Sequence, residues 1–413
     1  MAGLGRWRRA AVLVAGAMLG GSGLVVDASA EPLPVDSGQV GAGGVVIHGK
    51  GFGHGRGMSQ FGAYGAALAG RSSGQILAFY YPGTRPGALL NPPVRVRLTA
   101  LDGGILLIGP SSARPRIGIR ATGADRRIVT LGVGARGRLV PKAGGFAVQR
   151  PSGRVWATVA RLAPPVSVSG PTGQRIWFGR RKGDCKNSFD VVYAGSARAL
   201  YYHGRAYYQA VVRMETYLRG VLSSEMPAGW PAQALRAQAV AARSYAGWAR
   251  NRGYFYDVRD DTGDQCWDGA AAEHPNTTAA IAATRNLIST HGGRPILAQF
   301  SSSNGGQTAA GGAVYLPSRF DPFEARARSP YLAWRMTITP QRLAAFDGAG
   351  GITRPTSVMV VRRDGRGVWG GRVLAVRIVG RTAAGRSTYV TISGTTFRRA
   401  FGMRSNYFGF TAG

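Results

Sequence analysis

Acidic residues are scarce in this sequence of 413 residues. It has 19 Asp and Glu against 52 Lys and Arg, which gives a formal net charge of +33 at pH 7. Such a charge predicts affinity for polyanions, of which nucleic acid and anionic cell-wall polymers are two classes. Nucleic acid is not expected as a partner, because no nucleic-acid-binding motif accompanies the charge and the basic residues form no single stripe. We therefore expect affinity for anionic wall polymers or a membrane surface.

Long apolar runs are also lacking, with one exception at the start of the chain. Residues 10–26 are uncharged and mostly apolar, and several arginines precede them. Small residues at positions 28–30 complete the pattern of a secretory signal peptide over residues 1–30. Residues 31–44 are rich in proline and glycine, which predicts a flexible leader. Since no later run is long enough to span a membrane, we expect a secreted protein, extracellular or associated with the cell wall, without a transmembrane segment after cleavage.

Two stretches alternate short apolar runs with polar residues, a pattern typical of antiparallel strands. The first covers residues 94–185, where Gly, Pro and Asp separate the runs. It predicts a small sandwich or barrel, which serves either as a structural module or as a glycan-binding or wall-binding surface. The second lies near the end of the chain, where strand-like runs occupy residues 357–393.

Between these stretches lies a helical region built around one carboxylate. Residues 214–222 carry apolar side chains at helical spacing, and an alanine-rich helix follows Trp230-Pro231. Alanine is the best helix former, and proline is tolerated in the first helical turn. Because Pro227 and Gly229 break the chain between the two helices, Glu225 is placed at a corner near a helix end.

Glu225 is the candidate general acid. A carboxyl group near a helix C-terminus, or one shielded by apolar neighbours, is held protonated more readily, as a general acid requires. An ordinary surface or capping glutamate is the alternative, and the spacing alone leaves it open. Glu215 lies ten residues earlier and would point to a different face of the helix, so we do not pair it with Glu225.

A glycine-rich element occupies residues 45–93. It begins with a predicted strand at 45–48 and ends with a predicted helix over 72–81, and several glycines between them bracket His54 and Gln60. Glycine at this density lets the backbone come close to a partner. Two interpretations stay open: a loop that binds a sugar or a charged group, and a structural turn with a solvated histidine.

Carboxylates gather in one part of this otherwise basic chain. Ten of the 19 lie between Glu215 and Glu324. The spacing of a group in a glycine-containing loop differs from that of an EF-hand, so we predict a polar turn network there, and we expect neither a metal ion nor another cofactor. This group consists of Asp260, Asp261, Asp264 and Asp268.

The stretch around Glu225, LRGVLSSEMPAGWPAQALRAQAVAARSYA (218–246), resembles the signature of the SpoIID/LytB family, named for sporulation stage II protein D and amidase enhancer. A separate family element, GFGHGRGMSQFGAYGAALAG (51–70), normally lies near the C-terminus. Here it comes first, which indicates a permuted arrangement of the same parts. The resemblance extends through four further runs, DDTGDQCWDGA (260–270), AAIAATRNLI (279–288), QFSSSNGGQT (299–308) and FRRAFGMRSNYF (397–408).

Pattern and resemblance together predict an α+β fold, in which a helical catalytic core packs on antiparallel β units and carries a β-rich inserted module. Within the core we expect a third helix over 275–289 and a strand over 296–300. The expected divisions are a signal peptide (1–30), a leader (31–44), the GHGxGMSQ element (45–93), the β-rich module (94–185), a SpoIID-like core (186–310) and a C-terminal β-rich part of that core (311–413).

The resemblance implies a cell-wall protein. Sporulation members of the family are lytic transglycosylases, which cleave peptidoglycan glycan to 1,6-anhydro ends, and Glu225 matches their catalytic glutamate. The alternative that the family offers is a non-catalytic, peptidoglycan-binding activator of a cell-wall amidase. Arg243 is expected to position Glu225 or to stabilise charge. By the same resemblance the substrate-binding residues are Arg243, Gln238, Tyr245, His54, Gln60, Ser301 and Ser302.

Cysteine is rare, with Cys185 and Cys266 alone in the chain. Outside the cytoplasm an even pair indicates first a disulfide. Closing so long a loop would stabilise the fold by roughly 4 kcal/mol in the chain-entropy description. Zinc is the rival, since some family members bind it near the segment that matches Cys266, although the chain has no C-x-x-C pair and its nearest histidines are His203 and His274. Free thiols are the third possibility.

Overall fold

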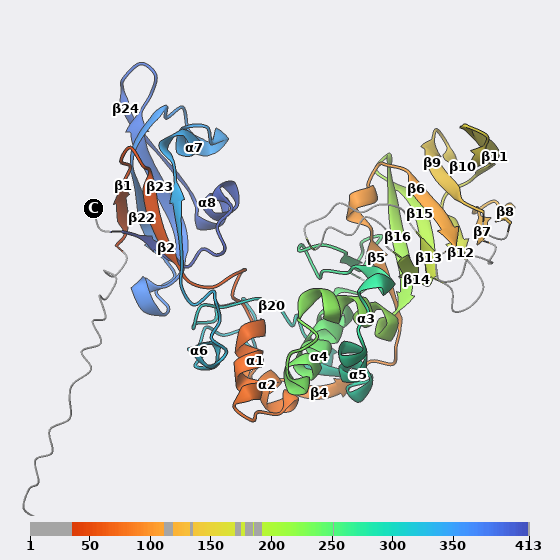
Figure 1. Ribbon diagram of the computed structural model, residues 1–413, viewed down its shortest axis with the longest axis horizontal. Coiled ribbons are helices and arrows are strands. Elements are labelled where there is room, and N and C mark those ends of the chain that lie inside the picture. The colour runs from red at the N-terminus through yellow and green to blue at the C-terminus, as the bar shows by residue number, and fades with distance from the viewer. Residues whose placement is uncertain are drawn as a thin grey trace, which may run out of the picture.

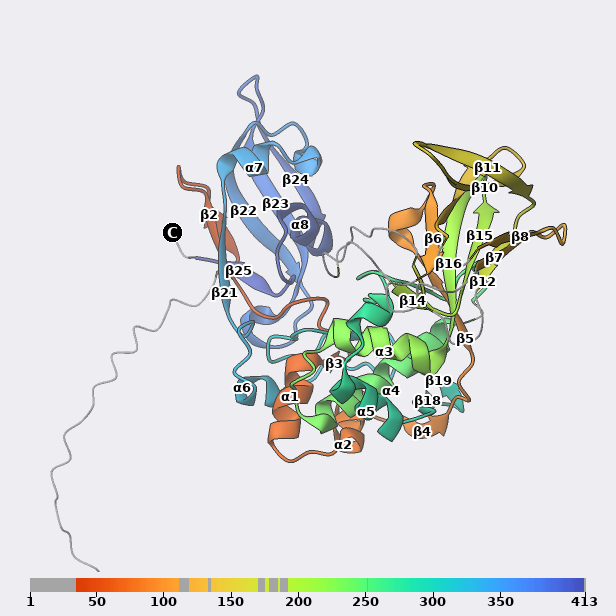
Figure 2. The same cartoon turned by 45° about the vertical axis from the view of Figure 1, so that its right-hand side comes forward.

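The computed structural model describes residues 35–110, 119–132, 135–169, 175–177, 185, 192–250 and 252–411. The predicted signal peptide and the first residues of the predicted leader lie outside this range. The fold is α+β, as predicted, and consists of a helical base that carries two separate β-rich lobes (Figures 1 and 2). No helix in the described part of the chain has both the length and the apolar character needed to cross a membrane.

The alanine-rich helix α4 (Ala232–Ala249) is the centre of the base. It is buried on nearly every side, because its alanines let the surrounding helices approach closely. Pro231 stands just before its first residue, and Met226 ends the preceding helix, so the predicted corner at Glu225 is present. Around α4 lie α1 (Gln60–Leu68), α2 (Ser73–Tyr80), α3 (Met214–Glu225), α5 (Pro275–Ala283) and the strand β18 (Leu287–His291).

Short strands and one further helix complete the base. The β3 strand pairs in parallel with β20, which joins the glycine-rich element to the serine run. The β18 strand pairs with β4 and β19. These elements are α6 (Phe323–Arg326), β3 (Met58–Ser59), β4 (Arg85–Ala88), β19 (Arg294–Pro295) and β20 (Phe300–Ser301).

The first lobe, here called the module lobe, holds two sheets. One has the strand order β17-β5-β16-β15-β12-β7-β8 and the other β11-β10-β9-β6-β13-β14. Its strands are β5 (Pro93–Arg97), β6 (Leu106–Pro110), β7 (Ile119–Thr122), β8 (Ile128–Leu131), β9 (Gly137–Lys142), β10 (Gly145–Ser152), β11 (Val155–Leu162), β12 (Val166–Ser169), β13 (Arg175–Trp177), β14 (Val192–Ala194), β15 (Ser196–Tyr202), β16 (Arg205–Arg213) and β17 (Val258–Arg259).

The division predicted at residue 185 needs correction. β16 lies in the predicted core and pairs with β5 of the predicted module, from Gln209 opposite Arg97 to Arg213 opposite Pro93. One sheet therefore contains strands from both sides of the predicted boundary. Sequence alternation locates strands but carries no information on which of them pair.

The second lobe, here called the C-terminal lobe, joins the two ends of the described chain. β2 (Val45–Gly49) pairs with β21 (Trp334–Ile338) and β25 (Phe408–Phe410). A neighbouring sheet has the order β1-β22-β23-β24. The strands predicted between 357 and 393 are present here. This lobe also contains β1 (Ser37–Gln39), β22 (Arg354–Arg363), β23 (Val373–Arg381), β24 (Ser387–Ser393), α7 (Pro340–Ala344) and α8 (Gly394–Phe401).

Three local predictions were wrong in part. The described end of the leader is ordered, since β1 pairs with β22 and Val40 donates to the carbonyl of Thr356. The third helix ends at Ala283 instead of 289, because residues 287–291 enter the β18 ladder. Most of the predicted strand at 296–300 forms no ladder; a strand begins only at Phe300. In the first two cases pairing with a distant strand overrode the local pattern, whereas at 298 and 299 the amides donate to the carbonyls of residues 296 and 297.

Candidate functional site

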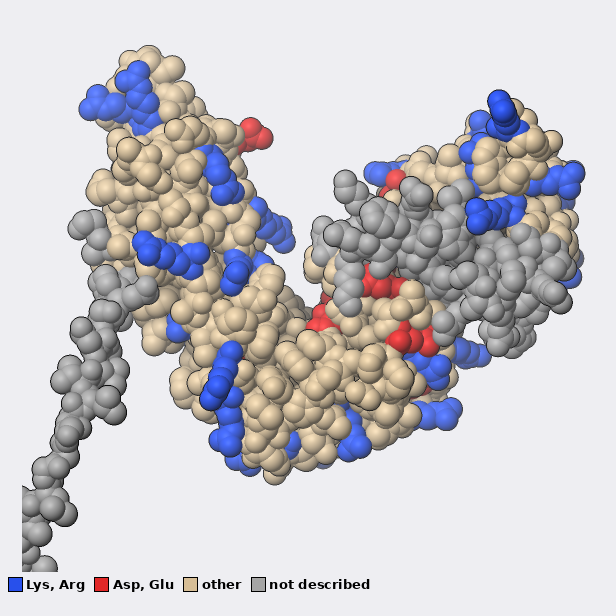
Figure 3. Space-filling view, viewed as in Figure 1, with Lys and Arg blue, Asp and Glu red and all other residues tan. Residues whose placement is uncertain are grey.

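A cavity of about 950 Å³ lies between the helical base and the C-terminal lobe. Residues from four separate stretches line it: the glycine-rich element, the end of α3 with the loop at 259–266, the serine run, and the C-terminal lobe. Figure 3 shows the molecule hollowed between its two lobes, with acidic side chains in the hollow and basic side chains on the facing side of the C-terminal lobe.

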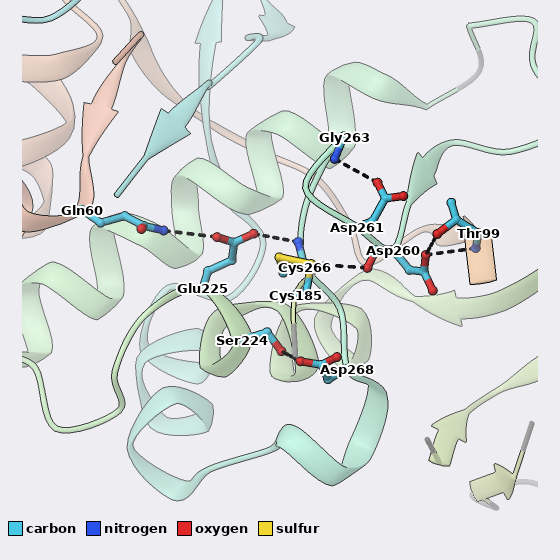
Figure 4. Close-up of a disulfide and its surroundings, with 10 residues drawn as sticks. All are labelled: Gln60, Thr99, Cys185, Ser224, Glu225, Asp260, Asp261, Gly263, Cys266 and Asp268. Carbon is cyan, nitrogen blue, oxygen red and sulfur yellow. Dashed lines mark hydrogen bonds between the residues drawn. A yellow bond between two sulfur atoms is a disulfide. The ribbon is translucent and has the colours of Figure 1, made fainter. Parts of the chain in front are cut away.

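Glu225 is the last residue of α3, and its half-buried side chain lines this cavity. The backbone amide of Cys266 donates to Oε1 over 2.7 Å, and Nε2 of Gln60 donates to Oε2 over 3.3 Å (Figure 4). Gln60 and Glu225 are 165 positions apart. The structure thus brings together the glycine-rich element and the helix corner that the sequence had singled out separately.

The glycine-rich element is held by backbone contacts that leave no room for larger side chains. Gly57 has φ +62°, and a Cβ there would lie 2.0 Å from the carbonyl oxygen of Gln299. Ser59 then caps α1 by accepting from the amide of Gly62. As a result Gln60, only 6% exposed, is the first residue of a capped helix that begins at the cavity.

His54 also lines the cavity, and its Nδ1 accepts from the amide of Arg56 over 3.0 Å. Desolvation, reinforced by the guanidinium groups of Arg56, Arg372 and Arg398, lowers the pKa of His54 to about 3. The ring is therefore neutral near pH 7. With Nδ1 engaged as an acceptor, Nε2 is left to carry the proton and to act as a donor.

The serine run forms the wall beside His54. Ser301 Oγ accepts from the amide of Gly55 over 3.2 Å, and the Ser302 carbonyl accepts from the amide of Phe61. Both serines line the cavity, but Ser301 is buried and Ser302 is only half-buried. Of the two, Ser302 is better placed to reach a ligand.

Two buried carboxylates behind this wall were not predicted as part of the site. Glu324 accepts from Ser59 Oγ, Ser303 Oγ and the amides of residues 304 and 305. Asp321 accepts from Tyr80 Oη and Asn304 Nδ2, each over 2.7 Å. These carboxylates tie the serine run to α1 and α2. Both lie in the part of the sequence where carboxylates gather, which marked that part for attention. The sequence did not indicate which protein groups they would hydrogen-bond.

The sulfur atoms of Cys185 and Cys266 form a disulfide, with their Cα atoms 5.5 Å apart (Figure 4). Of the three possibilities for these cysteines, the structure therefore has the first. Cys266 is also the residue whose amide contacts Glu225. Across the described residues, no group of three or more His, Cys, Asp or Glu side chains could hold a metal ion.

The acid loop forms a network of turns and ion pairs. Asp260 accepts from the amide and hydroxyl of Thr99, and Asp268 accepts from Ser224 Oγ over 3.0 Å. Asp264 lines the cavity, but Arg259 donates to its Oδ2. Tyr245 Oη donates to its Oδ1 over 2.7 Å. Burial, together with this carboxylate, raises the pKa of Tyr245.

Three of the predicted substrate contacts need correction. Gln238 and Arg243 have fully buried side chains, so neither can touch a substrate in the cavity. Arg243 pairs with Glu215, Nη2 to Oε2 over 2.8 Å, and not with Glu225. Tyr245 contacts Asp264 instead of lining the cavity itself. Arg243 anchors α4 to Glu215 and to the Leu287 carbonyl, because a buried arginine needs a carboxylate partner, and Tyr245 supports the wall through Asp264.

A basic wall on the C-terminal lobe was missed by the sequence reasoning. It faces the cavity opposite Glu225 and Asp264. Arginine is common along the whole chain, so nothing in the sequence marked these positions. The wall consists of Arg366, Arg372, Arg398 and Arg399, joined by Arg56 from the glycine-rich element.

Comparison with known proteins finds a family match for the central part of the chain. The family described as Stage II sporulation protein, SpoIID, matches residues 202–291. The central part of this chain is thus similar to the SpoIID/LytB family. The SpoIID match contains α3, α4, the acid loop and α5. Gln60, His54, the serine run and the basic wall lie outside it, so the match covers one side of the cavity.

Three curated relatives are similar over part of their length. The amidase enhancer of Bacillus subtilis (strain 168) is 35% identical over 132 residues, 30% of this chain and 17% of the relative. An uncharacterised protein of Brachyspira hyodysenteriae is 32% identical over 151 residues, 36% of this chain and 40% of its own. Stage II sporulation protein D of Bacillus amyloliquefaciens is 30% identical over 175 residues, which are 35% of this chain and 51% of the relative. The chain thus spans about a sixth to a half of these relatives.

Proposed function

We propose that this protein is a secreted, peptidoglycan-remodelling enzyme, a lytic transglycosylase in which Glu225 is the general acid and base. The observation that carries the proposal is the position of Glu225. It ends α3 at an open cavity and is held on one side by Cys266 and on the other by Gln60. The kinship with stage II sporulation protein D and an amidase enhancer supports a role at the cell wall.

The reaction requires one carboxyl group used twice. Glu225 donates its proton to the glycosidic oxygen as the bond from that oxygen to the muramyl anomeric carbon breaks. The 6-hydroxyl of the same muramyl residue then forms the new bond to the anomeric carbon, and its proton returns to Glu225. Hydrolysis would instead require a second carboxylate to act on water or on the sugar.

The other acid on the same side of the cavity supports this choice. Both oxygens of Asp264 are engaged, one by Tyr245 and one by Arg259. A carboxylate held by a cation and a phenol is a poor base or nucleophile, because these neighbours stabilise its ionised form and so reduce its tendency to take up a proton or attack a sugar. We therefore assign Asp264 to the wall and the proton transfers to Glu225.

Gln60 suits an acid that alternates between two protonation states. Its side-chain amide has both a donor and an acceptor, so it can donate to ionised Glu225, as in Figure 4, and after rotation accept from the protonated form. Its burial in the first turn of α1 keeps this partner in place through the cycle. His54 Nε2 and Ser302 Oγ are proposed to bind sugar hydroxyls nearby.

The test is release of 1,6-anhydro-muropeptides from purified peptidoglycan, measured by mass spectrometry. Glu225→Gln is expected to reduce the rate at least about 100-fold, the usual contribution of a general acid. Glu273→Gln, the same chemical change outside the lining of the cavity, is the control and should release product normally. Undiminished release by Glu225→Gln would reject the assignment.

A second function is favoured by the relative named amidase enhancer. In that case the cavity binds glycan without cleaving it, and the protein stimulates a separate cell-wall amidase. Peptidoglycan incubated with the chain would then gain no anhydro or reducing ends, while an added amidase would release stem peptides faster. Stimulation that survives Glu225→Gln would favour the activator.

The proposed location outside the cell rests on the N-terminal pattern. Fractionation of producing cells should find the protein in the medium or the wall fraction, and N-terminal sequencing should begin near Glu31. A protein retained with an intact residue 1–30 segment in the cytoplasm would contradict this part of the proposal.

A further inference from the structure

Arg372 is a buried cation whose guanidinium group forms no ion pair with a carboxylate in the described part of the chain, although its backbone amide donates to Asp364. Its side chain lines the cavity and is 4% exposed. Nη2 donates to the carbonyl oxygens of Asn304 and Gln307, over 2.7 and 3.2 Å, but Nη1 is buried with no hydrogen-bond partner in the described structure. Leaving a buried charge uncompensated is costly, so an anion in the cavity would recover part of that cost.

The arginines next to Arg372 likewise lack ion pairs within the described part of the chain. None of the arginines of the basic wall forms an ion pair with a described residue. Arg398 is half-buried, and the one hydrogen bond of its side chain to a described residue runs from Nε to the Met403 carbonyl over 3.2 Å. Arg366 and Arg399 are exposed at the same opening. Asp364 also lines the cavity, but its Oδ1 accepts from the amides of residues 366 and 372 instead of from a guanidinium.

Electrostatics agrees with this arrangement. Burial lowers the pKa of Arg372 to about 10 and also lowers that of Arg398, so both are still cations near pH 7 but are poorly solvated. The same two arginines help to keep His54 neutral. The C-terminal lobe therefore presents positive potential to the cavity, while Glu225 and Asp264 lie on the other side.

We propose that Arg398, backed by Arg372 and flanked by Arg366 and Arg399, forms a carboxylate subsite for the glycan that enters the cavity. The subsite rests on the proposed function in that the ligand is peptidoglycan. Such glycan offers a carboxylate in two places: on the lactyl ether of a muramyl residue that has lost its peptide, and on the stem peptide of one that has kept it. Guanidinium groups recognise carboxylates through paired hydrogen bonds.

The experiment measures binding and cleavage separately. Binding of fluorescent glycan strands is followed in a Glu225→Gln background, so that the ligand is not consumed. Three ligands are compared: strands with stem peptides, peptide-free strands, and peptide-free strands whose lactyl carboxylates have been converted to methylamides. Arg398→Gln should weaken binding of a carboxylated strand about tenfold or more, the size expected for one lost charge-assisted contact, and leave the methylamide unchanged. Arg398→Lys should restore part of the loss.

Arg377→Gln is the matched control. Arg377 lies on β23 close to Arg372 in sequence, stacks on Tyr389, and does not line the cavity. It removes the same charge and should change none of the affinities. If Arg398→Gln fails to fold, Arg399→Gln replaces it, because that side chain is exposed.

The ligands identify which carboxylate is bound. Tight binding of peptide-free strands with weak binding of methylamides assigns the lactyl group. Tight binding only of peptide-bearing strands assigns the stem peptide. Three results would overturn the carboxylate subsite. The first is equal affinity of the protein for all three ligands, and the second is an equal loss of affinity for all three in Arg398→Gln. The third is binding that depends on Arg398 but selects a poly(glycerol phosphate) in place of carboxylated strands.

Cleavage by the chain with Glu225 intact is assayed in parallel. Carboxylate-dependent binding without release of anhydro ends would leave the subsite standing and reject the enzyme. Release of anhydro ends, with binding that does not depend on the carboxylate, would support the enzyme and reject the subsite.

Discussion

The backbone amide of Cys266 donates to Oε1 of Glu225 over 2.7 Å, so a residue in a disulfide holds the candidate acid directly. Cys185, the other half of the disulfide, lies 81 positions earlier, between β13 and β14 of the module lobe in sequence. The covalent bond therefore links the stability of the fold to the geometry of the site.

Loss of this disulfide should cost both stability and activity. Cys185→Ala together with Cys266→Ala is expected to lower the free energy of unfolding by about 4 kcal/mol, the chain-entropy value for so long a loop, and to slow release of anhydro ends. Urea unfolding and product release measure the two effects. A thiol reductant should affect the parent chain but not the double variant. A double variant with parental stability and rate would show that the bond is dispensable.

Gln60→Ala should slow the reaction without unfolding the protein. Glu225 would lose the partner that orients its second oxygen, and we expect a rate at least about tenfold lower, equivalent to one hydrogen bond to a charged group. Gln149→Ala serves as control, since that side chain bonds Arg138 and Thr158 on the module lobe. A Gln60→Ala rate within twofold of the parent would remove Gln60 from the mechanism.

Gly57→Ala tests the close approach beneath the site. Gly57 and Gly70 both have positive φ, +62° and +78°, but a Cβ at Gly70 would meet no atom within 4 Å. Gly70→Ala should cost about 1 kcal/mol for its backbone conformation alone. Gly57→Ala should cost about 2 kcal/mol more, because the new methyl group overlaps the Gln299 carbonyl. Equal unfolding free energies for the two variants would contradict the predicted overlap.

His54 should make the fold weaker in acid. Its pKa is about 3 in the folded chain against an ordinary value of 6.5, so both states are neutral above pH 6.5. Below that pH the unfolded chain binds a proton that the folded chain does not, and the stability contributed by neutral His54 is lost as the pH falls from 6.5 toward 3. Urea unfolding at pH 7.5 and pH 4.5 should show a smaller difference for His54→Gln than for the parent. An unchanged difference would show that His54 takes up its proton as freely in the folded state.

Local patterns predicted the helices around Glu225 and most strands of the C-terminal lobe. The periodicity from Met214 to Leu222 and the alanines after Pro231 correspond to α3 and α4. These features depend on neighbours within a few residues, which a sequence displays directly. The same reasoning failed at residues 287–291, where a helical pattern gave way to pairing with β4, some 200 positions earlier.

The site was predictable in its parts and not in its assembly. Glu225, Gln60 and His54 were singled out from motifs, whereas the buried Glu324 and Arg372 were not. A carboxylate that accepts from two hydroxyls and two amides, and an arginine whose guanidinium forms no ion pair with a described acid, are defined by contacts among remote segments. Arg243 was assigned to the wrong carboxylate for the same reason, because only the fold shows that Glu215 lies within reach.

By itself the sequence determined the corner that presents Glu225, the glycines that let the His54 loop bend, and the pair of cysteines, since each follows from short-range chemistry along the chain. Only the tertiary structure decided which of these meet: Gln60 against Glu225, Cys185 against Cys266, and the basic wall against the acids across the cavity. Burial and hydrogen-bond partners are properties of space, and residues 165 positions apart become neighbours only when the whole core is folded.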